Sequence, residues 1–334
     1  MKANSFFMLY SCCVITQGAK RDAIYDLQRS SFKYIPKAMT MVLSLCKKGK
    51  SVDFIKRKFK ENERIIDEYF DFLIENEFGQ FVDEIDNCFV PLDTTANLYQ
   101  GINYAILDYS LESKYLLEDA IAQLGELRCE HLELRFYDFV TLDFIEHVLS
   151  AVQGTTISSV YMIVQYSEQL FVENIKKLHE KHPRMIMVIC VGAPKGFNKI
   201  LKNNHLVVFY TEQQVKDENN CGVFSKSYLT INTDFYVESL HYNNCLSNKL
   251  SVSRFGEIKN CPSMDRSFGN IATTTLKSAI ENSDFRDLWQ ISKDKIEGCN
   301  ICELRYICQD CRAYRRNKND IFSKPLKCSY NPCE

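Results

Sequence analysis

The sequence predicts an α/β protein with an N-terminal helical module and a C-terminal cysteine-rich segment. Apolar residues recur at helical spacing between residues 36 and 77, and strands alternate with helices from about residue 102. Six of the 15 cysteines fall within the last 36 residues. At 334 residues the chain is long enough for several domains, and we predict three, at residues 1–95, 96–240 and 241–334.

Composition narrows the function classes. Hydrophobic residues make up 46% of the chain and charged residues 25%, which is typical of globular proteins and indicates no membrane span. The net charge of -2 argues against general affinity for nucleic acid. The stretch "LYSC" loosely resembles a lipoprotein cleavage box, but the apolar run before it is short, so a buried strand is the better interpretation. We therefore expect a cytoplasmic protein, whose thiols stay reduced and form no disulfide framework.

Residues 1–95 have the outline of a winged helix. A first strand with "AIYDLQR" as its hairpin partner precedes three helices, and "GQFVDEIDNCFVPL" is predicted to form a two-stranded wing after Gly79. The helices are predicted in "IPKAMTMVLSLCKKG", "SVDFIKRKF" and "NERIIDEYFDFLIENE". The third helix with the preceding Glu61, "ENERIIDEYFDFLIENE", carries seven acidic residues against one Arg, a charge that would repel a phosphate backbone. Capture of an extended peptide beside the wing suits this module better.

The middle of the chain is predicted to be a partial (β/α) barrel around a parallel sheet. No Gly-rich phosphate loop follows any of the predicted strands. The predicted strands are 103–110, 131–139, 157–166, 184–192 and 205–211, and the helices 114–127, 142–154, 169–182 and a short one at 197–201. Further on, we expect a strand within 227–240, a hairpin of 249–255 with 257–261 around Gly256, and one or two helices in 275–298.

The spacing of the C-terminal cysteines predicts a site for a metal ion or an iron–sulfur cluster. "CNIC" and "CQDC" are two C-x2-C pairs only five residues apart, and thiolates so spaced can reach one metal or cluster. Common zinc modules leave 15 to 20 residues between such pairs. The spacing favours iron–sulfur clusters over zinc or an unmetallated thiol group. The scattered cysteines are interpreted as small buried hydrophobes: Cys12, Cys13, Cys46, Cys88, Cys129, Cys190 and Cys221.

The C-terminal pattern resembles a known family. Cys245, then Gly256-x4-Cys261, then C-x2-C-x5-C from Cys299 and further cysteines are similar to the SPASM domain, the auxiliary cluster-binding extension of many radical SAM peptide-modifying enzymes. "CCVITQGAKRDAIYDLQR", "FGEIKNCP", "SFGNI" and "ICQDCRAY" extend the resemblance to SPASM-containing peptide maturases of grasp-with-spasm systems. The resemblance implies a radical-SAM-like barrel followed by a SPASM domain with one or two [4Fe-4S] clusters.

The resemblance also implies ligand sets. One cluster would take Cys299, Cys302, Cys308 and Cys328. The other would take Cys245, Cys261 and Cys311, with His241, Cys221 or Cys333 as a possible fourth ligand, or with an open position. The chain departs from the family where it has C-x2-C before Cys311 in place of C-x3-C.

A larger departure concerns catalysis. Radical SAM enzymes hold their reactive cluster with C-x3-C-x2-C near the first barrel strand, and this spacing occurs nowhere in the sequence. S-adenosylmethionine is therefore not expected as a cofactor, and no catalytic residues are identified. The resemblance implies an accessory peptide maturase in the making of ribosomally synthesised, graspetide-type peptides, with a precursor peptide and an ATP-grasp ligase as partners. A redox enzyme using its auxiliary clusters and a zinc-stabilised interaction protein are the alternatives.

Overall fold

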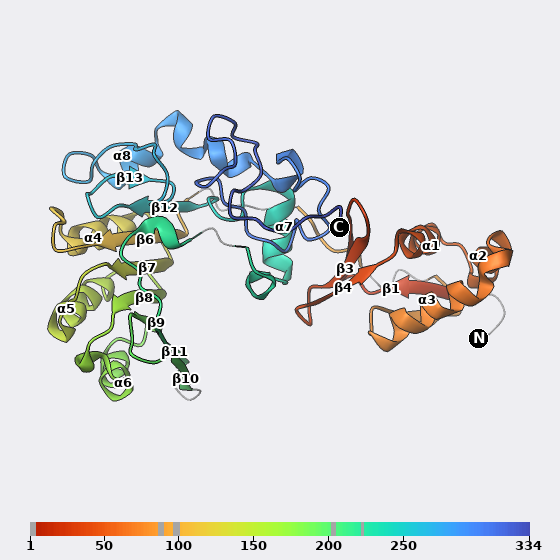
Figure 1. Cartoon of the computed structure of the whole chain (residues 1–334), viewed down its shortest axis with the longest axis horizontal. Helices are drawn as coiled ribbons and strands as arrows, with labels where there is room; N and C mark the ends of the chain where they lie inside the picture. Colours follow the sequence, from red (N-terminus) through yellow and green to blue (C-terminus); the bar gives the residue numbers. More distant parts are fainter. Residues whose placement is uncertain (1–4, 86–89, 96–100, 202–204, 222–223) are drawn as a thin grey trace.

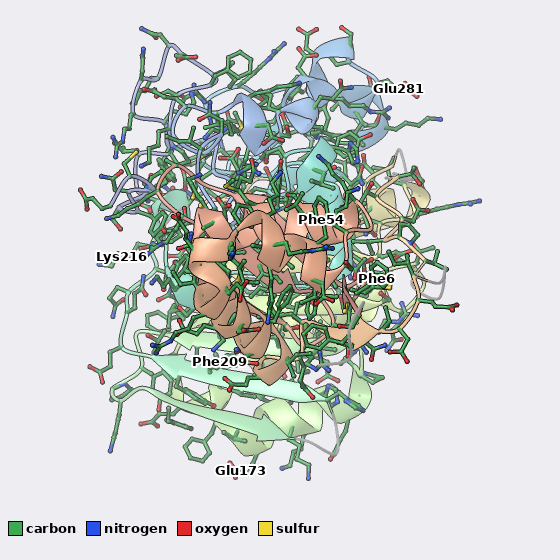
Figure 2. All side chains as sticks on the ribbon, turned by 90° about the vertical axis from the view of Figure 1, so that its right-hand side faces the viewer. Phe6, Phe54, Glu173, Phe209, Lys216 and Glu281 are labelled. Carbon is green, nitrogen blue, oxygen red and sulfur yellow. The ribbon has the colours of Figure 1, made fainter. Side chains whose placement is uncertain are left out.

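The N-terminal module and the large sheet lie at opposite ends of the molecule, with the C-terminal segment between them (Figure 1). This arrangement comes from a computed structural model, which describes residues 5–85, 90–95, 101–201, 205–221 and 224–334. Viewed from the N-terminal end, Phe54 on a helix of that module lies in front of the sheet that carries Phe209 (Figure 2).

Three helices of the N-terminal module pack on a short β ladder. The helices are α1 (Lys37–Lys47), α2 (Val52–Lys58) and α3 (Glu63–Glu75). The Ser51 side chain accepts a hydrogen bond from the Phe54 amide and so caps α2. The aromatic core of the module joins Phe7, Phe70 and Phe78, each at most 1% exposed.

The first strand of the predicted wing has a partner that the sequence analysis does not predict. Strand β5 (Gly79–Val82) pairs antiparallel with β1 (Phe6–Leu9), at the start of the chain, and this pairing completes a two-stranded sheet. The Phe7 ring packs against both Phe70 and Phe81, so burial of the first strand fixes its partner. The second half of the predicted wing includes residues 86–89, which lie outside the described residues.

A three-stranded antiparallel sheet follows β1. Its strands are β2 (Cys13–Gln17), β3 (Asp22–Asp26) and β4 (Ser31–Ile35), with β3 in the middle. The predicted hairpin with "AIYDLQR" is confirmed by the β2–β3 pairing. One face of this sheet belongs to a core that includes residues from the C-terminal segment: Ala23, Tyr25, Leu27, Tyr236, Leu304 and Ile307.

The large sheet has eight strands in the order β10-β11-β9-β8-β7-β6-β12-β13, and it is an open sheet of the α/β class. All pairings from β11 to β12 are parallel, whereas β10 and β13 are antiparallel edge strands. The strand bounds are β6 (Tyr104–Tyr109), β7 (His131–Phe136), β8 (Ser159–Gln165), β9 (Met185–Val191), β10 (Phe197–Leu201), β11 (Leu206–Thr211), β12 (Lys249–Val252) and β13 (Ile258–Lys259).

Strand alternation gives the sheet two unlike faces. Leu132, Leu134 and Phe136 of β7 are buried in the core shared with the helices α4 (Leu117–Glu126), α5 (Leu142–Val152) and α6 (Val172–Lys181). The intervening His131, Glu133 and Arg135 point to the opposite face, because successive side chains of a strand alternate. That second face is the one that forms part of the candidate site.

Two predicted elements have the wrong type. Residues 197–201 form the edge strand β10 where a helix is predicted, because antiparallel pairing with β11 prevails over local propensity. The strand predicted within 227–240 is instead a short helical turn, Lys226–Tyr228, followed by α7 (Thr233–His241). The Asn232 side chain accepts a hydrogen bond from the Phe235 amide at 2.8 Å and caps α7.

The remaining C-terminal elements are short. The hairpin around Gly256 is confirmed as β12 and β13. The helix α8 (Leu276–Ile280) is followed by the helical turns Ser283–Gln290 and Lys293–Lys295. The division into three domains stays a prediction; β12, which follows the proposed boundary at 240/241, pairs with β6 of the preceding segment. Within the described ranges, every helix is too short or too polar to cross a membrane.

Candidate metal centre

Seven cysteines line one cavity of about 830 Å³ between the large sheet and the C-terminal segment. They are Cys221, Cys245, Cys261, Cys299, Cys308, Cys311 and Cys328. The structure thus brings together six of the eight cysteines predicted as metal ligands, and it adds Cys221. The other two, Cys302 and Cys333, are not part of the cavity lining.

A first group of thiols consists of Cys221, Cys245, Cys261 and Cys311. A hydrogen bond from Cys261 lowers the pKa of Cys221 to about 5, and the same contact raises the pKa of Cys261 well above its usual value. Burial raises the pKa of Cys311 to about 11, with further contributions from the thiols of Cys245 and Cys221. Each of the four thiols therefore lies within electrostatic range of at least one other.

A second group consists of Cys299, Cys302, Cys308 and Cys328. Burial raises the pKa of Cys299 to about 11, and Cys308 and Cys328 are among the neighbours that raise it further. Burial also raises the pKa of Cys302 to about 12, again with contributions from Cys299 and Cys308. Cys302 thus joins this group although it does not line the cavity, and its sulfur accepts a hydrogen bond from the Leu304 amide at 3.4 Å.

The first C-x2-C pair sits in a tight turn. Gly298 has a φ of +70°, a conformation that favours glycine, and the Cys302 amide donates to the Cys299 carbonyl at 2.9 Å. The turn is fixed from below because Leu304 and Ile307 are fully buried against the three-stranded sheet. Apolar packing therefore holds the backbone of the turn that carries Cys299 and Cys302.

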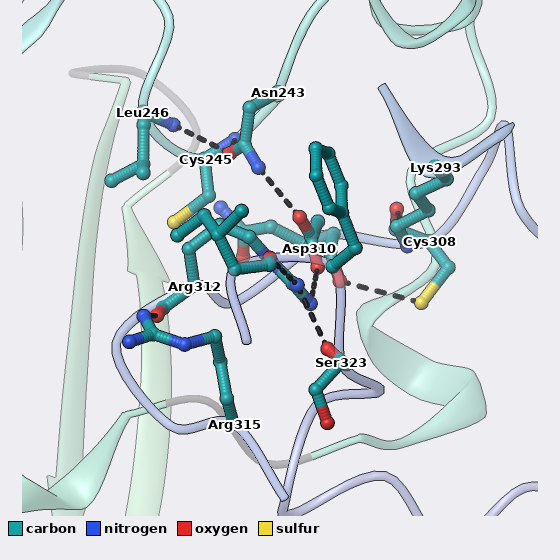
Figure 3. Close-up of polar contacts among 12 residues, drawn as sticks. Asn243, Cys245, Leu246, Lys293, Cys308, Asp310, Arg312, Arg315 and Ser323 are labelled. Carbon is teal, nitrogen blue, oxygen red and sulfur yellow. Dashed lines mark hydrogen bonds and ion pairs between the residues drawn. The ribbon is translucent and has the colours of Figure 1, made fainter. Parts of the chain in front are cut away.

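The second C-x2-C pair is held by a buried polar network centred on Asp310 (Figure 3). Asp310 accepts hydrogen bonds from the Arg312 Nη2 at 2.8 Å and from the Asn243 Nδ2 at 2.5 Å. The Oδ1 of Asn243 accepts from the backbone amides of Cys245 at 3.1 Å and Leu246 at 3.0 Å. Asn243 thereby couples the loop that carries Cys245 to the turn between Cys308 and Cys311.

Positive charge lies beside both thiol groups. Lys293 is 4% exposed and donates from its Nζ to the Cys308 carbonyl. Burial acts to lower the pKa of Lys293, but the neighbouring Cys308, Asp310 and Cys299 outweigh it and raise the pKa. A buried ammonium ion at this place would offset part of the negative charge of bound thiolates.

The sheet supplies the other wall of the cavity. Arg135 donates from its Nε to Glu133 at 2.6 Å, and the Tyr104 hydroxyl donates to the same carboxylate at 2.5 Å. The Arg135 guanidinium lowers the pKa of Cys221 and Cys245, although burial still leaves the pKa of Cys245 raised. The polar face of β7 therefore faces the first thiol group.

Three residues were possible as the fourth ligand beside Cys245, Cys261 and Cys311. Only Cys221 of the three lines the cavity, and its sulfur lies 3.5 Å from the Ser263 Oγ. His241 is exposed, and its Nε2 contacts the Thr94 carbonyl at 2.8 Å. Cys333 is exposed at the end of the chain.

Some of the scattered cysteines are buried, as predicted, whereas Cys221 lines the cavity. Cys13, Cys129 and Cys190 are buried, whereas Cys12, Cys46 and Cys221 are partly exposed. Cys88 lies outside the described residues. Little in the sequence favours Cys221 over the other two candidates for the fourth ligand, because 23 residues separate it from Cys245 and no paired cysteine lies near it.

The donor set consists of thiols, which suit both iron–sulfur clusters and structural zinc sites. Among the described residues, no three of these C-terminal cysteines have their sulfurs within 4.8 Å of one another. Each of the two groups supplies four thiols, the number of thiolates that a [4Fe-4S] cluster or a four-cysteine zinc site takes.

Comparison with known proteins yields no family. No protein-family model and no curated protein matches the chain. Among solved structures, the chain is similar to Streptococcus suis SuiB bound to S-adenosylmethionine, with 10% identity and a TM-score of 0.39 over 98% of this chain and 100% of that chain. It is also similar to SuiB bound to precursor peptide SuiA, with 9% identity and a TM-score of 0.30 over the same shares. At these values neither structure assigns an activity or a ligand to this chain.

Proposed function

We propose that this chain is an accessory maturase of ribosomally synthesised peptides, with two auxiliary iron–sulfur clusters in its C-terminal segment. The observation that carries the proposal is the presence of two groups of four thiols, of which seven thiols line one cavity and Cys302 lies outside its lining. One cluster would be held by Cys299, Cys302, Cys308 and Cys328, and the other by Cys221, Cys245, Cys261 and Cys311. Bound there, each cluster would supply one-electron chemistry or hold the surrounding loops in place.

The proposal includes no cleavage of S-adenosylmethionine. In the resembling family the reactive cluster follows the first barrel strand, which corresponds to β6 here. The segment after β6, residues 110–116, contains no cysteine. Within this segment Tyr115 is 8% exposed, and its hydroxyl donates to the Asp108 carbonyl at 2.6 Å.

The N-terminal module would capture the precursor peptide. Strand β4 lies at the edge of its sheet and pairs only with β3 among the described strands. An extended peptide can add to such an edge through main-chain hydrogen bonds. Exposed Ser31 and Lys33 alternate along β4 with half-buried Phe32 and Tyr34, so an added strand would meet one polar and one aromatic face.

An ATP-grasp ligase is the proposed second partner, which would form the bonds in the peptide while this chain presents it. This part of the proposal rests on the family resemblance of the cysteine pattern. Binding of small peptides encoded beside the gene to the full chain, and loss of that binding when residues 1–95 are removed, are the expected results. Undiminished binding without residues 1–95 would contradict the role of the N-terminal module.

Metal analysis after anaerobic purification tests the clusters. We expect about eight irons and eight sulfides per chain, four of each per cluster. The variant Cys221→Ala should lose about four irons, whereas Cys333→Ala should keep all of them. A colourless protein with stoichiometric zinc would support the zinc-stabilised alternative. Iron that is retained in Cys221→Ala but lost in Cys333→Ala would overturn the assignment of the fourth ligand.

A redox enzyme with an open iron position is the less supported alternative. An open position would need a cluster with only three protein ligands. Cys221 supplies a fourth thiol beside Cys261, which favours a fully ligated cluster. Formation of 5′-deoxyadenosine by the reconstituted protein under reducing conditions would refute the absence of radical SAM chemistry.

A further inference from the structure

A second concentration of metal-ligand atoms lies in the N-terminal module, far from the cavity in sequence. Cys12, Cys13 and Asp26 each place one ligand atom within 4.8 Å of the other two. The two sulfurs are 4.0 Å apart, close to the spacing of about 3.8 Å that two thiolates adopt on one tetrahedral zinc ion. Among the described residues, these three form the one group that meets this spacing.

The local fold explains how adjacent cysteines point the same way. In a continuous strand their side chains would lie on opposite faces. Here Cys12 belongs to a turn that closes with the Cys13 amide donating to the Tyr10 carbonyl at 2.9 Å, and Cys13 begins β2. Asp26 is the direct cross-strand partner of Cys13 in the β2–β3 ladder, which brings its carboxylate to the same side.

The carboxylate of Asp26 is already oriented by its own partners. Its Oδ1 accepts from the backbone amides of Gln28 at 3.0 Å and Arg29 at 2.9 Å, and its Oδ2 accepts from the Arg29 Nη1 at 2.9 Å. An ionised carboxylate can accept about four hydrogen bonds, so these contacts leave room for a metal. Carboxylate ligands of metal sites are commonly held by such outer hydrogen bonds.

Two of the three ligand residues are buried and the third is half-buried, an arrangement that suits a metal ion with one position open to water. Cys13 is 6% and Asp26 1% exposed, whereas Cys12 is half-buried. Thiolates select zinc over harder divalent ions such as Mg²⁺.

We propose that Cys12, Cys13 and Asp26 bind one Zn²⁺ ion, with the fourth position open to water. The turn that carries the thiols joins β1, which pairs with β5 of the helical module, to β2 of the three-stranded sheet. The ion therefore cross-links β2 and β3 at this junction. This site is independent of the clusters and of the proposed function.

The test uses the full chain and Zn²⁺ itself. Thiol alkylation is followed peptide by peptide by mass spectrometry, with and without Zn²⁺ at about ten times its dissociation constant. We expect alkylation of Cys12 to slow about tenfold, since only the metal-free fraction reacts. Cys46 is the internal control, because it is a partly exposed thiol of the same module that belongs to no group of three metal-ligand atoms among the described residues, and its rate should not change. Mg²⁺ should protect neither thiol.

Two variants complete the test. Cys12→Ser should hold one zinc ion fewer per chain than the wild-type protein, whereas Cys46→Ser should hold the same amount. Asp26→Asn should weaken zinc binding without removing either thiol. Equal protection of Cys12 and Cys46, or unchanged zinc content in Cys12→Ser, would overturn the proposal. The alkylation experiment needs no variant, so it decides the matter even where a substitution impairs folding.

Discussion

The buried pair of Asp310 and Arg312 gives the sharpest prediction about the cysteine-rich segment. Arg312 is 0% and Asp310 1% exposed, and the pair stands between Cys308 and the chain that follows Cys311. The variant Asp310→Asn keeps the shape of the side chain but removes its charge. Removing one partner of a buried ion pair costs about 3–5 kcal/mol, because the other charge stays buried without compensation.

The remaining contacts of Arg312 would compensate for little of this loss in the free energy of unfolding. Arg312 keeps the carbonyls of Ile321 and Ser323, each at 2.9 Å from its Nη1, but these are neutral acceptors. The new amide would also place donors opposite the donor groups of Asn243 or Arg312. We therefore expect the free energy of unfolding to fall by about 3–5 kcal/mol, or about 1–2 M in urea midpoint at a slope of about 3 kcal/mol/M.

The assay is urea unfolding of the anaerobically purified full chain, with iron content measured on the same samples. Asp284→Asn is the matched control, since Asp284 pairs with Arg266 at 2.5 Å but both side chains are about half exposed. Solvent screens that exposed pair, so its loss should change the urea midpoint little. The double variant Asp310→Asn with Arg312→Met should lose less than the sum of the two single losses. A loss in Asp310→Asn no larger than that in Asp284→Asn would show that burial of the Asp310–Arg312 pair does not make it more important for stability than an exposed pair.

Three further predictions concern other parts of the chain. Burial raises the pKa of Asp108 to about 7, although the Arg135 guanidinium acts to lower it. In the unfolded chain the pKa of an Asp is about 3.9. The stability that protonated Asp108 contributes is therefore complete below about pH 4 and is lost as the pH rises through about 7. Urea midpoints at pH 5 and pH 8 should therefore differ less in Asp108→Asn than in the wild type. Gly256→Ala should lower the free energy of unfolding by about 1–3 kcal/mol, because Gly256 has a φ of +83° and a Cβ there would lie 2.8 Å from the Asn270 Oδ1. An unchanged melting temperature in thermal unfolding would contradict this. Glu303→Gln should lower the free energy of unfolding in urea by about 1.5–3 kcal/mol. The fully buried Glu303 carboxylate accepts a hydrogen bond from the Arg21 Nε at 2.9 Å and links the three-stranded sheet to the cysteine-rich segment. A decrease of only about a few tenths of a kcal/mol would show that water replaces the contact.

Much of the architecture could be predicted because it rests on local periodicity. The alternation of strands and helices between residues 103 and 192 predicts β6 to β9 and α4 to α6, since amphipathic spacing is visible within each segment. The hairpin around Gly256 has a similarly local cause. The errors lie where a distant partner decides: residues 197–201 become a strand because β11 is beside them, and β5 pairs with β1, about 70 residues earlier.

The candidate metal centre likewise has one part that the sequence predicts and another that depends on distant contacts. The C-x2-C pairs of the last 36 residues identify a thiol-rich centre from the sequence alone, because the spacing itself lets two sulfurs face one metal. Which thiols meet across the cavity depends on the path of the chain between them. Cys221 comes from an irregular segment after β11, and only the packing of that segment against Cys261 and Ser263 brings its sulfur into the first group.

Local patterns in the sequence are enough to predict the α/β class, the concentration of thiols near the end of the chain and the lack of the spacing that a reactive radical SAM cluster requires. Three contacts appear only once the chain is folded: Cys221 lies beside Cys261, Asp310 and Asn243 join two cysteine loops, and Asp26 faces Cys12 and Cys13. The two sets differ because ligand spacing within a turn is a local property. Contacts between distant segments depend instead on how the whole chain buries its apolar surface.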